Sequence, residues 1–427
     1  MKILHVADFL PELHEVAGGA EFATRRVIDE QVAAGIEIEV ATLPVQKRQA
    51  VLPWSRHYEL AHLDRYAPRL AFAVKQLYYP RDPLGRAALQ RVLAQSQPQL
   101  VHFHNLHYTG LATLDCARAL GIPSVLTIYD YWLFCPSFML LTNHNQLCRR
   151  GHGAHCVDCV GTRRVRFLKP VKRALFAVRP EIFRRCAAAI DRFIVLSPAS
   201  RDILLEHGIT AERIEVIPQY LWQEAAASPR DQRPQRGRLV YVGWVEARKG
   251  LHVVIDALAR VAADYPELSI EVLGMPANAD YAQQIEAAIA AAGLGARVRF
   301  HGKLSRHDLL CELQRAYLVL VPEQWENMSP VILTEAMAAG ACVLASRVGG
   351  IRQFVEEFRT GLLAERDQPA EFATRIRWAM DNPDAITAMG AAARARAREL
   401  FDPTTITNKT LALYRGLTSR PATVQSA

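Results

Sequence analysis

Short apolar runs alternate with amphipathic segments along almost the whole chain, and this alternation is its clearest pattern. The runs have the length and the content of branched and aromatic residues that are typical of buried strands. The predicted strands are 2–7, 36–43, 100–104, 124–129, 193–197, 214–218, 239–243, 269–274, 297–302, 317–321, 342–346 and 361–364.

Helical patterns lie between most of these strands, because apolar residues recur there every three to four positions. The clearest predicted helices are 22–33, 251–263, 281–291 and 307–315, and a further helix at about 403–417 follows the last strand. Continuously apolar strands that alternate with helices predict parallel sheets covered on both faces.

The strands form two series, which are separated by a polar stretch rich in proline and arginine at 226–238. A chain of 427 residues is also too long for one hydrophobic core. We therefore predict an α/β protein with two Rossmann-like, doubly wound parallel-sheet domains and an interdomain cleft. The expected domains are 1–225 and 239–402, joined by the linker 226–238, with the helix in 403–427 packing back toward the N-terminal domain.

Composition excludes only a few classes of protein. Half of the residues are hydrophobic and 22% are charged, which is ordinary for a globular protein. The sequence contains no apolar run of the roughly 20 residues that a transmembrane helix needs, and its first residues read as a strand and not as a secretory signal. A cytoplasmic protein is the expectation.

The chain is basic, with a formal net charge of +8, and the excess is concentrated between Arg149 and Arg185. Few aromatic residues accompany this cluster, and no nucleic-acid-binding module surrounds it. We expect an anionic membrane surface, at the inner face of the plasma membrane, or a phosphate-bearing substrate, and no nucleic acid. A solvated helix face is an equally good interpretation of the same residues.

The segment 317–340 is the most informative for function. An apolar strand leads into a polar loop with Glu323, Glu326 and Asn327, and Ser329 followed by Pro330 predicts a helix start with a hydroxyl cap. The helix is expected over 330–339 and is ended by Gly340. A helix N-terminus at the carboxyl end of a buried strand is where a phosphate-bearing ligand binds in α/β sheets.

Four of the eight cysteines fall within a basic insertion at about 135–175: Cys135, Cys148, Cys156 and Cys159. The last two have the spacing of a zinc knuckle, so we predict a closed structural zinc site. A redox-active pair and plain reduced thiols are the alternatives, because a stable disulfide is unusual in the cytoplasm. The other cysteines stand in apolar contexts and are predicted core residues: Cys116, Cys186, Cys311 and Cys342.

Several motifs in this order resemble a known family, the retaining glycosyltransferases of family 4 (GT4) with the GT-B fold. The resemblance covers nearly the whole chain. Its motifs lie at 18–21, 102–105, 129–136, 195–197 with 216–218, 241–250, 319–340 and 346–350.

The resemblance implies roles for residues that would bind the donor. Lys249 matches the family's phosphate-binding lysine, and Arg248 lies beside it. Gly18 and Gly19 would allow the backbone to approach the diphosphate. The other implied donor contacts are Glu335 to the ribose hydroxyls, and Glu326 with the segment Asn327, Met328 and Ser329 to the donor sugar. No metal or cofactor is implied for catalysis.

On the acceptor side, His104 with Asn105 and Tyr129 with Asp130 are the candidate residues, whereas His102 is expected to be a buried, hydrogen-bonded histidine. The sequence departs from the family pattern at three places. Trp244 replaces an arginine that usually follows the glycine at Gly243. The loop between Glu326 and Glu335 is one residue longer, and Tyr129 stands where a histidine is common.

The leading interpretation is a metal-independent retaining glycosyltransferase. It would move a sugar from a UDP- or GDP-linked donor to a hydroxyl of a glycan or lipid-linked acceptor, as in bacterial polysaccharide or glycolipid assembly. The alternatives are a nucleotide-sugar epimerase or hydrolase on the same fold, and a non-catalytic nucleotide-sugar-binding module.

Overall fold

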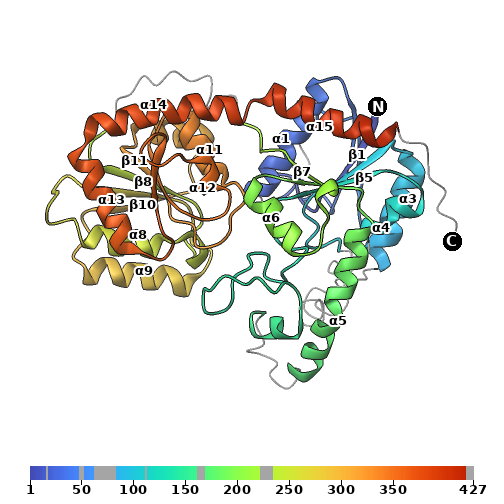
Figure 1. Ribbon diagram of the computed structural model, residues 1–427, viewed down its shortest axis with the longest axis horizontal. Coiled ribbons are helices and arrows are strands. Elements are labelled where there is room, and N and C mark those ends of the chain that lie inside the picture. The colour runs from blue at the N-terminus through green and yellow to red at the C-terminus, as the bar shows by residue number, and fades with distance from the viewer. Residues whose placement is uncertain are drawn as a thin grey trace. The chain divides into compact units, whose positions relative to one another are not determined.

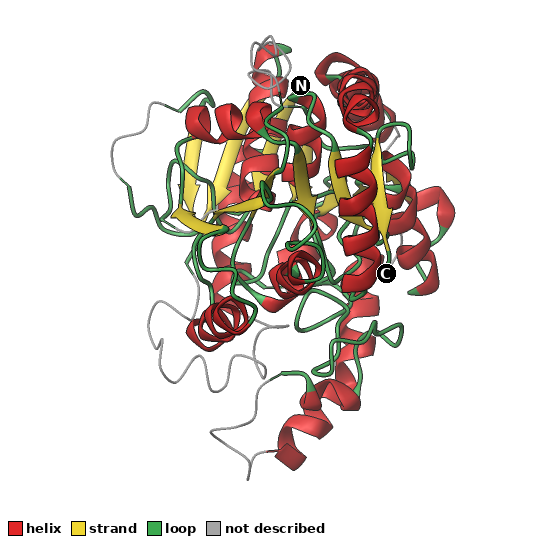
Figure 2. Ribbon diagram, turned by 90° about the vertical axis from the view of Figure 1, so that its left-hand side faces the viewer, coloured by secondary structure: helices red, strands yellow, loops and turns green. Residues whose placement is uncertain are grey.

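The computed structural model describes residues 1–15, 18–47, 52–61, 83–110, 113–160, 169–221 and 234–419. The chain forms two compact units, of which unit 1 contains Met1–Tyr220 and Pro403–Ala427 and unit 2 contains Leu221–Asp402 (Figure 1). Each unit is built around its own parallel sheet, with helices on both of the faces (Figure 2).

The sheet of unit 1 has seven strands in the order β3-β2-β1-β4-β5-β6-β7. All of its strand pairs are parallel. The strands are β1 (Lys2–Val6), β2 (Glu37–Thr42), β3 (Arg56–Glu59), β4 (Leu100–Phe103), β5 (Ser124–Ile128), β6 (Arg192–Val195) and β7 (Ile214–Val216).

Most of the helices of unit 1 cover this sheet, and α15 from the end of the chain is one of them, whereas α5 extends away from it (Figure 1). The helices of this unit are α1 (Gly19–Ala33), α3 (Pro83–Ser96), α4 (Leu114–Ala119), α5 (Lys169–Ala188), α6 (Pro198–Glu206) and α15 (Pro403–Thr418), with 3-10 turns η4 (Ala154–Asp158) and η6 (Ala211–Arg213). Helix α15 packs on α1. Its Tyr414 is fully buried and accepts a hydrogen bond from Gln31 of α1 at 3.0 Å.

The sheet of unit 2 has six parallel strands in the order β10-β9-β8-β11-β12-β13. They are β8 (Arg238–Val242), β9 (Ser269–Leu273), β10 (Val298–Gly302), β11 (Leu318–Val321), β12 (Val343–Ser346) and β13 (Gly361–Ala364). Its helical elements are η7 (Ala247–Lys249), α8 (Leu251–Ala259), α9 (Ala279–Ala291), α10 (Arg306–Arg315), α11 (Val331–Ala338), α12 (Ile351–Phe354), α13 (Pro369–Asp381) and α14 (Pro383–Leu400).

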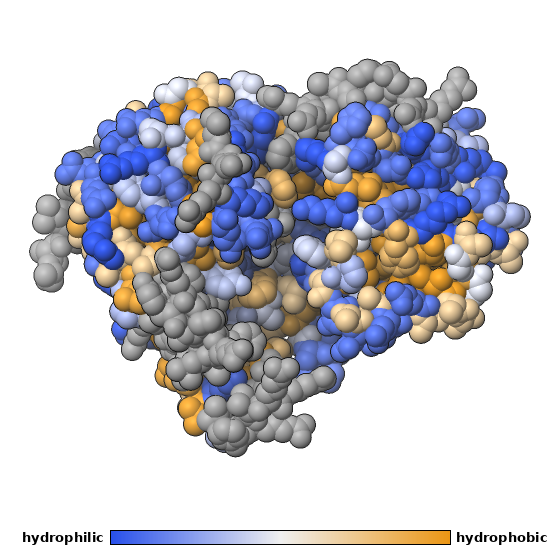
Figure 3. All heavy atoms as spheres, turned by 180° about the vertical axis from the view of Figure 1, so that it is seen from behind, coloured by the Kyte–Doolittle hydropathy of each residue, from blue (hydrophilic) through white to orange (hydrophobic). Residues whose placement is uncertain are grey.

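Local sequence explains where several helices begin. Ser197 caps α6 by accepting a hydrogen bond from the Ser200 amide, and Pro198 occupies the first helical position. Asn278 and Ser305 cap α9 and α10 in the same way. The apolar residues of the strands and of the inner helix faces fill the cores, while the face seen in Figure 3 is mostly polar with separate apolar patches.

The predicted architecture of two parallel-sheet α/β domains is confirmed. Each of the predicted strands is present, with ends that differ by at most two residues. The strand β3 was not predicted, because its sequence Arg-His-Tyr-Glu at the sheet edge contains no apolar run. The chain passes into unit 2 at Leu221, and the predicted linker lies outside the described residues up to 233. Among the described helices, none combines the length and the apolar character that are needed to cross a bilayer.

Candidate functional site

The candidate site of unit 2 lies at the carboxyl end of its central strands. β8 and β11 are neighbours, and the chain order reverses between them, since β9 lies on the outer side of β8 and β12 on the outer side of β11. Ligands of open α/β sheets bind at such a switch point. The connections that follow β8, β11 and β12 carry Lys249, Glu323 to Glu335, and Gly349.

The turn that carries Lys249 is pressed against the loop after β11. Gly250 has a φ of +72°, and a Cβ atom added there would lie 1.9 Å from the Pro322 carbonyl oxygen. The amide of Gln324 donates to the Arg248 carbonyl oxygen at 2.8 Å. This backbone contact fixes the position of the Lys249 backbone relative to the loop.

Lys249 forms an ion pair with a buried carboxylate. Its ammonium group lies 2.5 Å from Oε1 of Glu323, whose residue is only 2% exposed. The other oxygen of Glu323 accepts a hydrogen bond from the indole of Trp325 at 2.6 Å. The Lys249 side chain keeps 18% of its surface exposed. Glu323 therefore holds in place a cation that still reaches solvent.

Arg248 lies beside this pair and is similarly restrained. Its guanidinium is 2.6 Å from a carboxylate oxygen of Glu246 and 5.6 Å from the ring centre of Trp325. Two neighbouring cations at a strand end, each positioned by a carboxylate, are the groups that can stabilise charge on a phosphate.

The loop after β11 is polar in sequence but buried. Glu326 accepts a hydrogen bond from the Gly349 amide at 2.7 Å, and the Gly350 amide donates to the Asn327 carbonyl at 2.9 Å. A Cβ atom at Gly349 would lie 2.1 Å from that carbonyl oxygen. Met328 is fully buried. The Glu326 carboxylate is thus fixed by the turn that follows β12.

The start of α11 differs from the prediction. The helix begins at Val331 and Pro330 is its N-cap residue, with an extended ψ of 125° and no side-chain cap. Ser329 does not cap the helix; its amide donates to the Asn327 side chain at 3.2 Å. Gly340 ends the helix as predicted, with a φ of +77°.

Glu335 is buried in α11 and is paired across to α10. Its carboxylate accepts a hydrogen bond from Arg306 at 2.9 Å, and the residue is 6% exposed. The pairing neutralises one of the acidic charges of this edge, which favours an anionic ligand nearby.

In unit 1, the glycines predicted to approach the diphosphate form the start of α1. Gly18 is the N-cap in an extended conformation and Gly19 is the first helical residue. The Gly18 amide donates to the Glu21 carboxylate at 2.7 Å. Neither glycine has a positive φ. Glycine at these two positions therefore leaves space at a helix N-terminus, and a left-handed conformation is not required.

A histidine surrounded by carboxylates lies at the carboxyl edge of the unit 1 sheet. Nε2 of His107, after β4, is 3.1 Å from Asp130, after β5. Asp130 also accepts from the Trp132 amide at 3.0 Å and the Asn105 side chain at 3.4 Å. Burial lowers the pKa of His107, but the charges of Asp130, Asp8 and Glu21 raise it by more, so the net pKa is raised.

The raised pKa of His107 predicts a stability that depends on pH. A histidine whose pKa is raised by folding stabilises the fold fully below its unperturbed pKa of 6.5, and this contribution is lost as the pH rises through the folded value. Between neutral and mildly alkaline pH, we expect the free energy of unfolding of the wild type to fall by an amount on the order of 1 kcal/mol. The variant His107→Gln should not show this fall.

Thermal unfolding of wild type and variant across that pH range checks this prediction. Buried histidines with a lowered pKa, such as His5 and His102, reduce the stability of the fold only below pH 6.5. They therefore do not affect the comparison at higher pH. Parallel curves for the two proteins above that pH would contradict the assignment.

The predicted acceptor residue His104 is instead part of a buried network. His104 is fully buried, with Nε2 2.9 Å from Nδ1 of His5 and Nδ1 3.3 Å from the Tyr129 hydroxyl. His5 is also 3.0 Å from Gln31. His104 therefore contacts protein groups through both nitrogens, and the histidine of this loop that reaches the surface is His107.

His102 is buried and hydrogen-bonded, as predicted. Its ring nitrogens are 2.7 Å from the Thr127 hydroxyl and 2.5 Å from the Tyr414 hydroxyl. His5, His102 and His104 are the one group of three possible metal ligands that the described part of the chain brings within 4.8 Å. Since each ring nitrogen has a protein partner, the network is explained without an ion.

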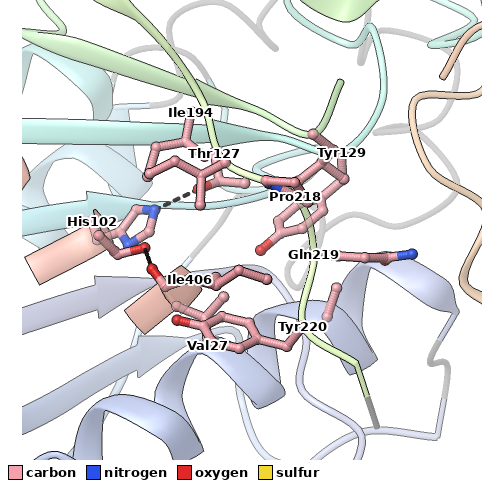
Figure 4. A pocket seen from close by; sticks show the side chains of 13 residues that line it. Val27, His102, Thr127, Tyr129, Ile194, Pro218, Gln219, Tyr220 and Ile406 are labelled. Carbon is pink, nitrogen blue, oxygen red and sulfur yellow. Dashed lines mark hydrogen bonds between the residues drawn. The ribbon is translucent and has the colours of Figure 1, made fainter. Parts of the chain in front are cut away.

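A small cavity in unit 1 lies beside this network. Its volume is about 20 Å³, which suits one water molecule and not a sugar. His102 and Thr127 line one side and Tyr129, Pro218 and Gln219 the other (Figure 4). Tyr129 is 8% exposed, and its hydroxyl is directed into the interior.

The four clustered cysteines lie in the segment between β5 and α5. Cys135 and Cys156 are buried, and Cys148 and Cys159 are half-buried. Burial raises the pKa of Cys156 to about 11, and the neighbouring thiols Cys135, Cys159 and Cys148 add to this. No three of the four sulfur atoms, all in the described segment, lie within 4.8 Å of one another.

No role was predicted from the sequence for Glu323, Arg306 and His107, each of which pairs with a predicted site residue. Glu323 lies two residues after the end of β11, and a carboxylate so close to a strand end was an available signal. His107 lies three residues after His104, and a count of polar residues after β4 would have included it. Arg306 gave no signal, because its pairing with Glu335 depends on the packing of α10 against α11.

Comparison with known proteins covers both units. The sequence model described as "Glycosyltransferase Family 4" matches residues 17–219, and the one described as "Glycosyl transferases group 1" matches residues 225–396. The chain is similar to the D-rhamnosyltransferase WbpZ of Pseudomonas aeruginosa, at 24% identity over 94% of this chain and 92% of that protein. It is also similar to a D-inositol 3-phosphate glycosyltransferase of Arthrobacter, at 26% identity over 90% and 86%.

The fold has solved counterparts. The crystal structure of Anabaena Alr3699/HepE in complex with UDP-glucose aligns over 98% of this chain and all of that one, with a TM-score of 0.70 and 17% identity. At this identity the likeness concerns the fold, which is that of two-domain GT-B glycosyltransferases.

Proposed function

The chain belongs to the GT4-type glycosyltransferases, and from this premise we propose its reaction: transfer of a sugar from a UDP- or GDP-linked donor to a hydroxyl of a glycan or lipid-linked acceptor, with retention of configuration. The role would be in bacterial cell-surface polysaccharide or glycolipid assembly. A rhamnosyltransferase relative and a structural neighbour solved with UDP-glucose support the donor class.

The observation that carries this proposal is the restrained lysine at the switch point of unit 2. Lys249 is held by Glu323 on one side and by the Gly250–Pro322 backbone contact on the other. A pre-positioned cation stabilises a leaving diphosphate without reorganising during the reaction, which is the main source of catalysis in such transfers. Arg248 adds a second positive charge next to it.

In the proposed reaction the bond between the anomeric carbon and the diphosphate oxygen breaks, and a bond from that carbon to the acceptor oxygen forms on the same face. The acceptor proton passes to the departing diphosphate. Lys249 and Arg248 stabilise the negative charge that develops on the leaving group. The two cations fulfil the role that a divalent metal has in other transferases, so turnover is expected to be unchanged by added magnesium or manganese.

Carboxylates of the same edge would bind hydroxyl groups of the donor. A carboxylate oxygen accepts hydroxyl hydrogen bonds, and two oxygens suit a diol. Glu335, oriented by Arg306, is proposed to bind the ribose, and Glu326, oriented by the Gly349 amide, the donor sugar. In unit 1, Asp130 with His107 is proposed to orient the acceptor hydroxyl.

A transfer assay tests the reaction. The protein is incubated with a panel of nucleotide-sugars, with and without a hydroxyl acceptor, and donor and product are followed by NMR. We expect donor consumption that depends on acceptor and an unchanged anomeric configuration. Consumption of donor at the same rate without acceptor would identify a hydrolase or epimerase, and an inverted product would contradict retention.

We also propose that the four clustered cysteines bind a structural zinc ion. The four cysteines belong to one segment, in which two are buried and two are half-buried. Zinc would draw the sulfurs together and lower their pKa. Elemental analysis of protein purified without added metal or chelator should give about one zinc per chain; less than a tenth of that would exclude the site.

A further inference from the structure

Helix α5 has one face that the protein covers. Lys172, Phe176, Arg179, Phe183 and Ala187 are buried, at the three- and four-residue spacing of a single helix face. The cysteine-rich segment packs on this face. Phe176 clusters with Cys156 and Val157, and the ring centre of His152 lies 3.6 Å from that of Phe183, with the two rings tilted by 32°. The guanidinium of Arg179 lies 4.9 Å and 5.3 Å from the two phenylalanine rings.

The opposite face of α5 exposes apolar side chains. Val171 is 54% exposed and Val178 is 56% exposed. They lie seven residues apart, on the same side of the helix. Pro170, Ala174 and Ala177 between and beside them are exposed as well. Single exposed apolar residues are common, but a continuous apolar stripe on one helix marks an interaction surface.

Basic side chains flank this stripe. Six basic residues and one acidic residue lie within α5 in the sequence. Lys169, Arg173, Arg184 and Arg185 are exposed. Arg184 and Arg185 share one carboxylate, Glu181, at 2.8 Å and 2.7 Å, so this group keeps a positive charge. Lys169 pairs with Asp158 of η4 at 2.8 Å, on the side of the helix that the cysteine-rich segment covers, so it does not belong to this surface.

An apolar stripe with flanking cations matches an anionic bilayer in both of its properties. Valine side chains enter the region between headgroups and acyl chains, while lysine and arginine side chains bind the headgroup phosphates. A nucleic acid would match the charges but leave the valines in water. Within unit 1 the helix also extends away from the sheet (Figure 1).

We propose that the outer face of α5 is a docking surface for anionic lipid bilayers, with Val171 and Val178 inserted at the interface and Arg173, Arg184 and Arg185 on the headgroups. The cysteine-rich segment supports the helix from its inner face. This inference goes beyond the proposed function, because lipid binding and transfer to a soluble acceptor are measured separately and can fail separately.

Co-sedimentation of the full-length protein with vesicles tests the docking surface. Wild type should bind vesicles of phosphatidylcholine mixed with phosphatidylglycerol, and not phosphatidylcholine alone, and salt should weaken the binding. One unit of charge near an anionic surface is worth about a fivefold change in binding. Val171→Glu should therefore weaken binding at least about fivefold, and Val171→Glu with Val178→Glu at least about 25-fold.

Leu120→Glu is the matched control. Leu120 follows α4 in the same unit, is also 54% exposed and undergoes the same change of charge. We expect it to change binding by less than about twofold, since it is not on α5. Equal effects of Val171→Glu and Leu120→Glu would overturn the docking surface, as would equal binding of wild type to both vesicle types. Arg173→Gln, with an expected loss of about fivefold, replaces Val171→Glu if thermal unfolding shows that variant to be misfolded.

Discussion

Replacing Lys249 is expected to lower kcat by about 10²–10³-fold, the loss seen when one pre-positioned group that stabilises transition-state charge is removed. The ion pair with Glu323 complicates the simplest variant. Lys249→Ala leaves a carboxylate that is 2% exposed without its cation. Removing one partner of a buried pair costs about 3–5 kcal/mol, and somewhat less here because the lysine retains solvent contact.

The double variant Lys249→Met with Glu323→Gln separates catalysis from folding. It removes both charges together and keeps the approximate volume, so unit 2 should unfold near the wild-type temperature while kcat remains about 10²–10³-fold lower. Arg260→Ala is the control, because Arg260 forms an exposed ion pair with Asp256 in the same unit; its turnover should equal wild type. A double variant with near-normal kcat would show that Lys249 does not contact the leaving group.

The second large effect is expected at Gly250. In Gly250→Ala the new Cβ would lie 1.9 Å from the Pro322 carbonyl oxygen, and the backbone has a positive φ. The turn and the loop must move apart, which shifts Lys249 away from Glu323. We expect a destabilisation of roughly 3 kcal/mol or more, a fall of the unfolding temperature of unit 2 by roughly 6–12 °C, and a loss of turnover of at least about tenfold.

Gly293→Ala is the control that measures the backbone cost without the steric contact. Gly293 also has a positive φ, +66°, but a Cβ atom there meets nothing within 4 Å. Its replacement should therefore show only the backbone cost, about 1–2 kcal/mol, and normal turnover. If both alanine variants unfold alike and both remain active, the contact between the Lys249 turn and the loop after β11 is not what positions the lysine.

The sequence predicted the two-sheet architecture because its apolar runs are short, continuous and separated by helical patterns. It also placed Lys249, Glu326 and Glu335 correctly at strand ends and in α11. The alternation is a local property, and the carboxyl ends of parallel strands always share one edge. Residues that follow strands could thus be assigned to that edge without knowledge of the packing.

The sequence did not show which side chains pair with one another at the carboxyl edge of each sheet. Glu323 was recognised as part of the loop but not as the partner of Lys249, because the two are 74 residues apart and meet only through the adjacency of β8 and β11. His104 and His107 are both histidines after β4. Only the side-chain network with His5 and Tyr129 decides that the first is buried and the second meets Asp130.

The start of α11 shows how a local rule can be displaced. Serine before proline is a strong signal for a capped helix, but Pro330 takes an extended conformation and becomes the cap position itself. The Asn327 side chain binds the Ser329 amide, and the loop turns inward at Met328, which is fully buried. Burial of the loop, and not the capping preference, sets where the helix begins.

Thermal unfolding of the full-length protein with UDP, GDP and their sugar conjugates tests most directly whether unit 2 binds a nucleotide diphosphate through Lys249. A ligand at a hundred times its dissociation constant adds about 2.7 kcal/mol, which raises the unfolding temperature by roughly 5–10 °C. We predict this shift for the UDP or the GDP series, and its loss in the variant Lys249→Met with Glu323→Gln. No shift with either series, or an equal shift in wild type and variant, would contradict it.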